Sequence, residues 1–354
     1  MKPMLCRQLV PSVIAVTLLT LASATVSPVV ARDATAPSPV ELPRDEAPHD
    51  VATEWWYVTG HLRTDADRLF GFQLVFFRAI RGSLKGIVAH AAVTDSAAGE
   101  FSYDQRAELD RQPRASTSSL HVQLGDWVLA GADGVYALAA RVPTYAFRLR
   151  VVASRPAVLH TGDGYFLGAT GQPSYYYSFT RMQVTGELTA GQQTLPVHGQ
   201  AWMDHQWGDF TQLSAAGWDW LAVQLDDGRE VMAFFFRDQN GMRHFGAATL
   251  VDADGAAQAL TADQVGLVPL QTWTSGTSGA TYPIAWRLTI AGADLDVVVT
   301  AVLPDQELDT RRTTGLTYWE GQAMVQDAMA EGRVAGLAYV ELTGYARERD
   351  GVVP

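Results

Sequence analysis

The sequence has little cysteine and a deficit of basic charge. Of its 354 residues one is cysteine, and 26 Lys and Arg stand against 38 Asp and Glu, which gives a formal net charge of -12. A single cysteine excludes a disulfide framework. An acidic chain without a basic stripe argues against nucleic acid as a partner. Neither a Gly-x-Gly-x-x-Gly or P-loop motif nor His-Glu-x-x-His is present, so the sequence indicates no cofactor and no metal site.

The N-terminus has the pattern of an export signal. Lys2 and Arg7 flank the start of an apolar run, Leu9–Ala24, and small residues offer cleavage after Ala24 or Ala31. Residues 1–31 are therefore predicted to be a cleaved signal peptide, which leaves a periplasmic or secreted mature chain with no integral membrane span. Residues 32–50 are rich in Pro, Ala and acidic residues without apolar periodicity, and are predicted to be a flexible lead-in.

The remaining sequence favours an all-β fold. Short segments with period-2 alternation, such as Trp56–Leu62 and Val231–Phe236, are separated by Gly, Asp and Pro. Helical periodicity is scarce, and Thr261–Val265 and Gln322–Ala330 are given a few turns at most.

An internal repeat divides this β region. Trp55-Trp56-Tyr57 opens a strand, turn and strand ending in Phe-Phe-Arg, and a similar plan starts at Trp218, 163 residues further along (55 to 218). Two tandem antiparallel barrels are predicted, at residues 51–205 and 206–350. One large sandwich is the alternative.

The segment Ala201–Asp209 holds a carboxylate, an imidazole and two indoles. In a strand, His205 and Trp207 would share one face while Asp204 points to the other. An imidazole beside an indole in a dry cavity can transfer a proton, and the indole face can stabilise a developing cation. The alternative is that the tryptophans are core anchors and the histidine is simply buried.

Two further aromatic segments are candidates for a ligand site. Glu54 precedes Trp55-Trp56-Tyr57, and burial among indoles would raise its pKa and make it a proton donor. The alternative is an exposed residue at the start of a strand. In the segment Tyr175–Phe179, alternate aromatic residues such as Tyr177 can line an apolar cavity or form ordinary core.

These segments together resemble a known family. The motifs are Glu54–Gly60, Gln73–Arg78, Trp202–Gly208, Gly217–Trp220, Tyr318–Gly321 and Glu341–Tyr345. In this order, over residues 48–347, the chain is similar to the lipocalin-like AttH and carotenoid 1,2-hydratase (hydroxyneurosporene synthase) superfamily. The resemblance implies two lipocalin-like barrels in tandem.

The resemblance also implies a function, the cofactor-independent addition of water to an isoprenoid double bond. His205 and Trp207 then belong to the active site, with Asp204 or Asp219 as the proton source. The residues expected to surround a hydrophobic, isoprenoid or lipid-like ligand are Glu54, Trp55, Trp56, Tyr57, His90, Tyr177, Trp218 and Trp220. The alternative implied by the AttH members is a noncatalytic periplasmic carrier associated with an ABC transporter.

Overall fold

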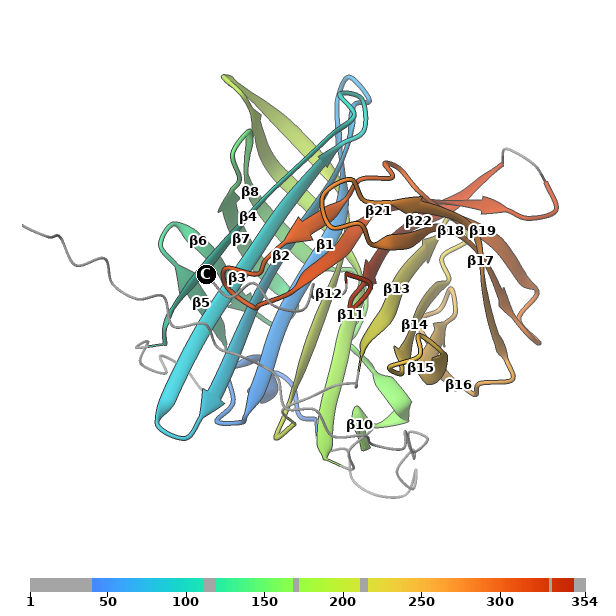
Figure 1. Ribbon diagram of the computed structural model, residues 1–354, viewed down its shortest axis with the longest axis horizontal. Coiled ribbons are helices and arrows are strands. Elements are labelled where there is room, and N and C mark those ends of the chain that lie inside the picture. The colour runs from blue at the N-terminus through green and yellow to red at the C-terminus, as the bar shows by residue number, and fades with distance from the viewer. Residues whose placement is uncertain (1–39, 111–118, 168–171, 211–215, 331–332, 347–354) are drawn as a thin grey trace, which may run out of the picture.

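The computed structural model describes residues 40–110, 119–167, 172–210, 216–330 and 333–346. Most of these residues form antiparallel strands, and the two helices within these ranges, η1 (Arg44–Glu46) and η2 (His160–Gly162), are single 3-10 turns. The strands make two curled, nearly closed sheets that stand side by side (Figure 1). The predicted fold class, two antiparallel barrels in tandem, is confirmed.

The first sheet, barrel 1, has the strand order β4-β3-β2-β1-β12-β11-β8-β7-β6-β5, and β9 and β10 both pair with β11. Its first and last strands, β1 and β12, are therefore neighbours. The strands are β1 (Thr53–Thr64), β2 (Leu69–Arg81), β3 (Leu84–Asp95), β4 (Glu100–Leu109), β5 (Leu120–Leu124), β6 (Trp127–Ala132), β7 (Val135–Arg141), β8 (Tyr145–Ala153), β9 (Val158–Leu159), β10 (Tyr165–Leu167), β11 (Pro173–Ala190) and β12 (Gln193–Gly208).

The second sheet, barrel 2, has the order β16-β15-β14-β13-β22-β21-β19-β18-β17, and β20 pairs with β21. Its first and last strands, β13 and β22, are again neighbours. The strands are β13 (Gly217–Leu225), β14 (Glu230–Arg237), β15 (Arg243–Val251), β16 (Ala257–Leu260), β17 (Val265–Thr274), β18 (Thr281–Ile290), β19 (Leu295–Ala301), β20 (Glu307–Asp309), β21 (Thr317–Asp327) and β22 (Val334–Leu342).

The repeat in the sequence corresponds to the opening hairpin of each barrel. In the β1–β2 hairpin Trp55 lies opposite Phe77, and in the β13–β14 hairpin Trp218 lies opposite Phe236. Aromatic cross-strand pairs of this kind stabilise antiparallel pairing and fix its register. The two barrels thus begin with the same supersecondary unit.

Each barrel is filled by its own side chains. The interior of barrel 1 includes Trp56, Phe72 and Trp127, all with no exposed surface, and the interior of barrel 2 includes Trp286 and Trp319. These side chains come from alternate positions along the strands, as period-2 patterning requires. The interiors are therefore packed cores.

The outward faces of both barrels meet in an extended interface. Strand β1 contacts β22, β2 contacts β21, and β11 contacts β13. Aromatic side chains dominate this interface, among them Tyr57, Tyr176, Trp202, Trp220, Phe234 and Tyr339. Polar bonds also cross it: His90 Nδ1 lies 2.8 Å from the Tyr318 hydroxyl, and Thr94 donates to Gln306 Oε1 at 2.7 Å. The parts of these strands that lie at the interface are consequently buried on both faces.

Residues 40–50 differ from the predicted flexible lead-in. Asp45 and Glu46 are buried, and the backbone N–H of Asp133 donates to Glu46 Oε2 at 2.9 Å. This segment packs against barrel 1 through the bond of Glu46 to Asp133 and through Val40, which belongs to the core of that barrel. Residues 1–39, with the predicted signal peptide, lie outside the described residues.

The strands also bear on two other expectations, the helical turns and the boundary between the barrels. The helical turns allowed at Gln322–Ala330 are wrong, because the strand β21 runs through to Asp327. Within Thr261–Val265, residues 262–264 form a turn that leads into β17 at Val265. The boundary placed between residues 205 and 206 falls within β12, which continues to Gly208.

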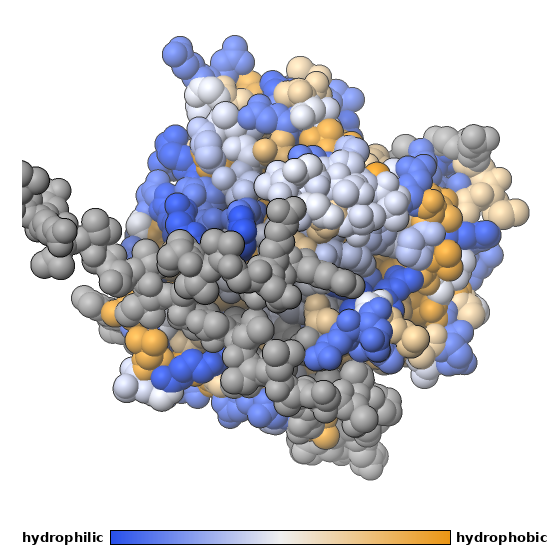
Figure 2. Space-filling model, viewed as in Figure 1, coloured by the Kyte–Doolittle hydropathy of each residue, from blue (hydrophilic) through white to orange (hydrophobic). Residues whose placement is uncertain are grey.

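The surface drawn in Figure 2 mixes hydrophilic and hydrophobic residues. Hydrophobic residues gather on its right-hand side, where Figure 1 places β17, β18 and β19. Neither of the helices found in the described residues is long and apolar enough to span a membrane.

Candidate functional site

The adjoining strands β1 and β12 divide the predicted site residues between two faces. Trp56 lies opposite His205 in this pairing, and Glu54 lies opposite Trp207. These four side chains point into barrel 1. Asp204 alternates with them and points toward barrel 2, so the structure separates it from its sequence neighbour His205 as the alternation predicted.

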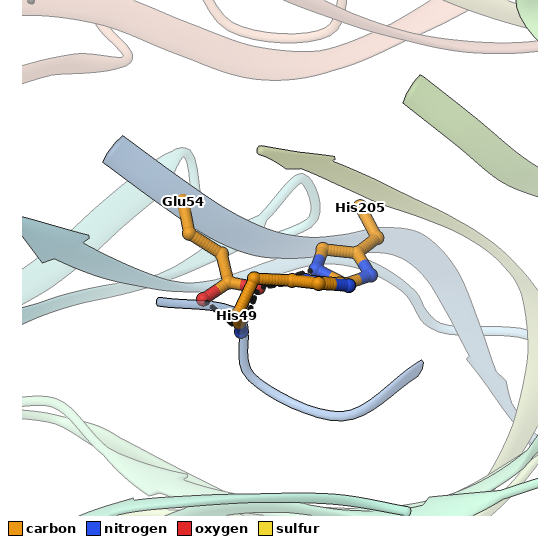
Figure 3. A group of neighbouring side chains, drawn as sticks. All are labelled: His49, Glu54 and His205. Atoms are coloured by element: carbon orange, nitrogen blue, oxygen red, sulfur yellow. Dashed lines mark hydrogen bonds and ion pairs between the residues drawn. The ribbon is translucent and has the colours of Figure 1, made fainter. Parts of the chain in front are cut away.

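The inward face carries a compact group that we call the histidine–glutamate cluster: His49, Glu54 and His205 (Figure 3). Glu54 Oε1 lies 2.7 Å from His49 Nδ1 and 3.1 Å from His205 Nε2. The backbone N–H of His49 also donates to both Glu54 oxygens at 3.0 Å. The carboxylate is thus the centre of the cluster.

Buried polar partners hold the cluster in place. Arg78 donates to Glu54 Oε2 at 3.0 Å and to Asp110 Oδ2 at 2.9 Å. His205 Nδ1 lies 3.2 Å from the hydroxyl of Tyr177. Arg78 is thus the shared partner of two carboxylates, those of Glu54 and Asp110.

Aromatic rings enclose the two imidazoles. The ring of His205 lies 4.6 Å from that of Trp207 and 4.9 Å from that of Trp56, and His49 stacks on Trp207 at 4.3 Å. Trp56 and His205 have no exposed surface, and Trp207 is 4% exposed. Because these rings contact one another directly, this group is packed as part of the barrel core.

The electrostatics of the cluster oppose the predicted role of Glu54 as a proton donor. Burial alone would raise its pKa, but hydrogen bonds from His205 and His49 outweigh burial and lower the pKa. Burial lowers the pKa of His205, whereas the pKa of His49 is raised because Asp45 and Glu54 outweigh its burial. Glu54 therefore acts as an ionised acceptor.

A second group lies on the outward face, between the barrels. Glu320 of β21 and Glu341 of β22 are cross-strand partners, and we call them the carboxylate pair. Burial raises the pKa of Glu320 well above its usual range, and the charge of Glu341 adds to this rise. Burial also raises the pKa of Glu341 to about 7, although Trp218 donates to its Oε2 at 3.0 Å. Burial therefore favours the protonated form of both carboxyl groups, and an ionised Glu341 further disfavours ionisation of Glu320.

Polar side chains with unused hydrogen-bonding capacity surround the carboxylate pair. The hydroxyls of Tyr57 and Tyr339, both amide atoms of Gln73 and Glu320 Oε1 are buried, and within the described residues none of them makes a hydrogen bond of good geometry. The hydroxyl of Tyr57 nevertheless lies close enough to Glu320 to oppose the rise in its pKa. Leaving such atoms unsatisfied costs free energy. The group is therefore suited to binding a polar atom or a water.

The other predicted residues also lie in or near this interface. Asp204 accepts bonds from Tyr176 at 2.5 Å and Trp202 at 2.6 Å, and burial raises its pKa to about 6. Trp220 donates to the Tyr176 hydroxyl at 3.1 Å. Trp55 packs against Phe77 and Phe210, and His90 contacts Tyr318 and Thr313.

Asp219, by contrast, joins neither group. Arg237 donates to it at 3.0 Å and the hydroxyl of Tyr345 donates to it at 3.0 Å. Burial raises its pKa, with Arg237 and Arg243 acting in the opposite sense. Its contacts are those of a buried ion pair.

Sequence reasoning missed three of the residues that form these groups: His49, Glu320 and Glu341. The last two lie within motifs that carried the family resemblance, Tyr318–Gly321 and Glu341–Tyr345, and their strand alternation could have placed them on one face. No local pattern marks His49.

Comparisons with known proteins agree with the fold described above. The family model described as AttH-like matches residues 33–345. The chain belongs to the AttH-like family. No protein of curated function matches it.

Solved structures that are similar to this AttH-like chain include the following three. A crystal structure assigned as AttH from Nitrosomonas europaea is 35% identical, with a TM-score of 0.78 over 88% of this chain and 99% of that one. Kievitone hydratase from Nectria haematococca is 19% identical, with a TM-score of 0.66 over 88% of this chain and 96% of that one. CghA, solved with Sch210972, is 11% identical, with a TM-score of 0.52 over 83% and 89%. The last two share the fold.

Proposed function

We propose that this AttH-like protein adds water to a hydrophobic, isoprenoid or lipid-like small molecule by cofactor-independent acid catalysis between the two barrels. The carboxylate pair is the observation that carries this proposal. Two adjoining buried carboxyl groups, of which an ionised Glu341 helps to keep Glu320 protonated, provide an acid and a base in one site. The similarity in fold to kievitone hydratase is consistent with it.

The proposed reaction uses both members of the pair. Glu320, held protonated by burial, gives its proton to one alkene carbon, and the other carbon becomes a tertiary carbocation. Water attacks the cation and loses a proton to the ionised form of Glu341, whose pKa is about 7. Transfer of that proton from Glu341 back to Glu320 restores the enzyme, so the net change is addition of one water. Glu320 replaces Asp204 and Asp219 as the proton source in this proposal.

The aromatic surroundings suit both the ligand and the cation. Trp55, Phe77 and Trp218 are only partly buried at this interface, and Trp218 contacts Glu341 directly. Aromatic side chains suit contact with an apolar ligand, and indole faces stabilise a nearby positive charge. His205 and Trp207 lie on the opposite face of β12, where we assign them a structural role: their packing inside barrel 1 keeps β12 in place.

The second candidate is a noncatalytic carrier. Its support is the match to AttH, together with a buried interface whose polar atoms can bind a ligand without reacting. In either case we propose export by residues 1–31, with an ABC transporter as the partner of the carrier form.

Turnover in labelled water tests the proposal. The full chain is incubated with an acyclic isoprenoid alcohol bearing a terminal trisubstituted double bond, in water enriched in heavy oxygen, and the products are weighed by mass spectrometry. We expect gain of one labelled water, lost by about a hundredfold or more in Glu320→Gln and Glu341→Gln. The exposed Glu187→Gln on β11 is the matched control and should keep full activity.

Ligand binding distinguishes the two candidates. Both pair variants should retain affinity for the isoprenoid within about tenfold. Binding by the unaltered protein without turnover would favour the carrier, and equal turnover in Glu320→Gln would overturn the assignment of the acid.

A further inference from the structure

The histidine–glutamate cluster combines ligand atoms from three separate places in the fold. His49 precedes β1, Glu54 lies within β1, and His205 comes from β12. One nitrogen of each histidine and one oxygen of the glutamate all lie within 4.8 Å of one another. Figure 3 shows both imidazoles directed at the same carboxylate. Two imidazole nitrogens and one carboxylate oxygen are ligands that divalent transition metals use in proteins.

The remaining polar atoms of these side chains are held by neighbours. His205 Nδ1 lies 3.2 Å from the Tyr177 hydroxyl, and His49 Nε2 lies 3.4 Å from Asp45 Oδ1. Glu54 Oε2 accepts from Arg78 at 3.0 Å, which leaves Oε1 as the atom facing both imidazoles. Metal-binding histidines and carboxylates in proteins are oriented by this kind of outer hydrogen bond. The cluster therefore has the supporting contacts of a metal centre as well as its ligands.

The charges around the cluster also favour a cation. Glu54, Asp45 and Asp110 contribute three carboxylates within this network. Arg78 is the buried guanidinium that opposes them, and Arg44 pairs with Asp45 from an exposed position. The surroundings therefore retain negative charge that a divalent ion would neutralise.

We propose that His49, Glu54 and His205 bind one divalent transition-metal ion, with Zn²⁺ as the best match to this ligand set. The ion takes the place of the hydrogen bonds that now join both imidazoles to Glu54 Oε1. Three protein ligands leave one position of a tetrahedral ion for water. Because His49 lies outside the barrel strands, the ion would tie residues 40–50 to β1 and β12.

This site is independent of the proposed hydration. It lies inside barrel 1, whereas the carboxylate pair lies on the outward face toward barrel 2. A failure of the metal proposal therefore leaves the proposed function untouched, and the reverse also holds.

Metal titration of the full chain tests the site. The protein is stripped with a chelator, dialysed, and titrated with Zn²⁺ by calorimetry and with Co²⁺ by visible absorption. We expect one ion per chain, a Co²⁺ spectrum of low coordination number, and a higher unfolding temperature with the metal. His49→Ala should weaken binding by at least about tenfold, the loss typical even of residues that only support a ligand.

The choice of variants separates loss of a ligand from loss of the fold. His49 is 20% exposed and precedes the barrel strands, so its replacement leaves the sheet pairing intact, which circular dichroism checks. His244→Ala is the matched control, because His244 pairs with Asp238 in barrel 2 and is 37% exposed. Loss of binding in His49→Ala alone supports the site. No stoichiometric binding by the unaltered protein, or equal affinity in both variants, overturns it.

Discussion

Replacing Glu341 by glutamine should change the pH dependence of stability in a defined direction. Burial raises the pKa of Glu341 from its ordinary value of 4.5 to about 7 in the folded protein. Between these values the folded state binds more protons than the unfolded state, so stability is greatest below pH 4.5 and falls until the pH passes about 7. Glutamine cannot ionise, and its carbonyl oxygen can still accept the bond from Trp218, so the variant removes this loss.

The size of the effect follows from the two pKa values. A rise from 4.5 to about 7 corresponds to about 3 kcal/mol of unfolding free energy. Between about pH 5 and about pH 8 the linkage relation gives about 2.5 kcal/mol of that loss. Partial exposure of the Glu341 side chain reduces the expected difference to about 2 kcal/mol. The variant should therefore match the unaltered protein near pH 5 and exceed it near pH 8.

Urea denaturation at both pH values measures the difference, with circular dichroism and tryptophan fluorescence as independent probes of two-state behaviour. Glu187→Gln, on the exposed side of β11, should follow the unaltered protein at both pH values. If Glu341→Gln changes the free energy of unfolding by the same amount at both pH values, the raised pKa of Glu341 is refuted. A variant less stable than the unaltered protein at about pH 8 would show that the ionised carboxylate is a favourable partner in this interface.

Three further substitutions probe packing and polar contacts, each scored by urea denaturation. Arg78→Leu should cost about 3–5 kcal/mol because it leaves Glu54 and Asp110 without their buried partner, whereas Arg63→Leu breaks an exposed pair and should cost less than about 1 kcal/mol. Gly199→Ala should lower the free energy of unfolding by at least about 3 kcal/mol, because the new Cβ would lie 1.9 Å from the His61 carbonyl oxygen. Gly276→Ala is the control: its new Cβ meets no atom within 4 Å, so the free energy of unfolding should change little. Tyr339→Phe should leave stability within about 1 kcal/mol, since its hydroxyl has no described partner, and a loss above about 2 kcal/mol would show that the hydroxyl is satisfied.

Local patterns in the sequence were sufficient to predict the barrels. Alternation depends only on which face of a strand is buried, and the repeated aromatic hairpin depends on pairs such as Trp55 with Phe77 and Trp218 with Phe236. Both signals lie within short stretches of chain. The number of barrels could therefore be predicted before any long-range contact was known.

The residues that were missed depend on distant contacts. Gln322–Ala330 is rich in residues with good helix propensity, but pairing of β21 with β19 and β22 outweighs that preference. His49 is placed by stacking on Trp207 and by hydrogen bonding to Glu54, and neither partner can be recognised from the sequence around it. The partnership of Glu320 with Glu341 likewise exists only once β21 and β22 are paired.

The segment Ala201–Gly208 was interpreted from the sequence as one site, and the burial of β12 on both faces explains why. All eight of its residues are buried, because β12 packs into barrel 1 on one face and against barrel 2 on the other. His205 serves the histidine–glutamate cluster, while Asp204 joins the interface and its charge contributes to the raised pKa of Glu341. In a strand with two buried faces, sequence neighbours belong to different environments and residues two apart belong to the same one. The density of reactive side chains in this motif thus reflects two separate groups, one on each face of the strand, and substitutions at its adjacent positions should act on different parts of the protein.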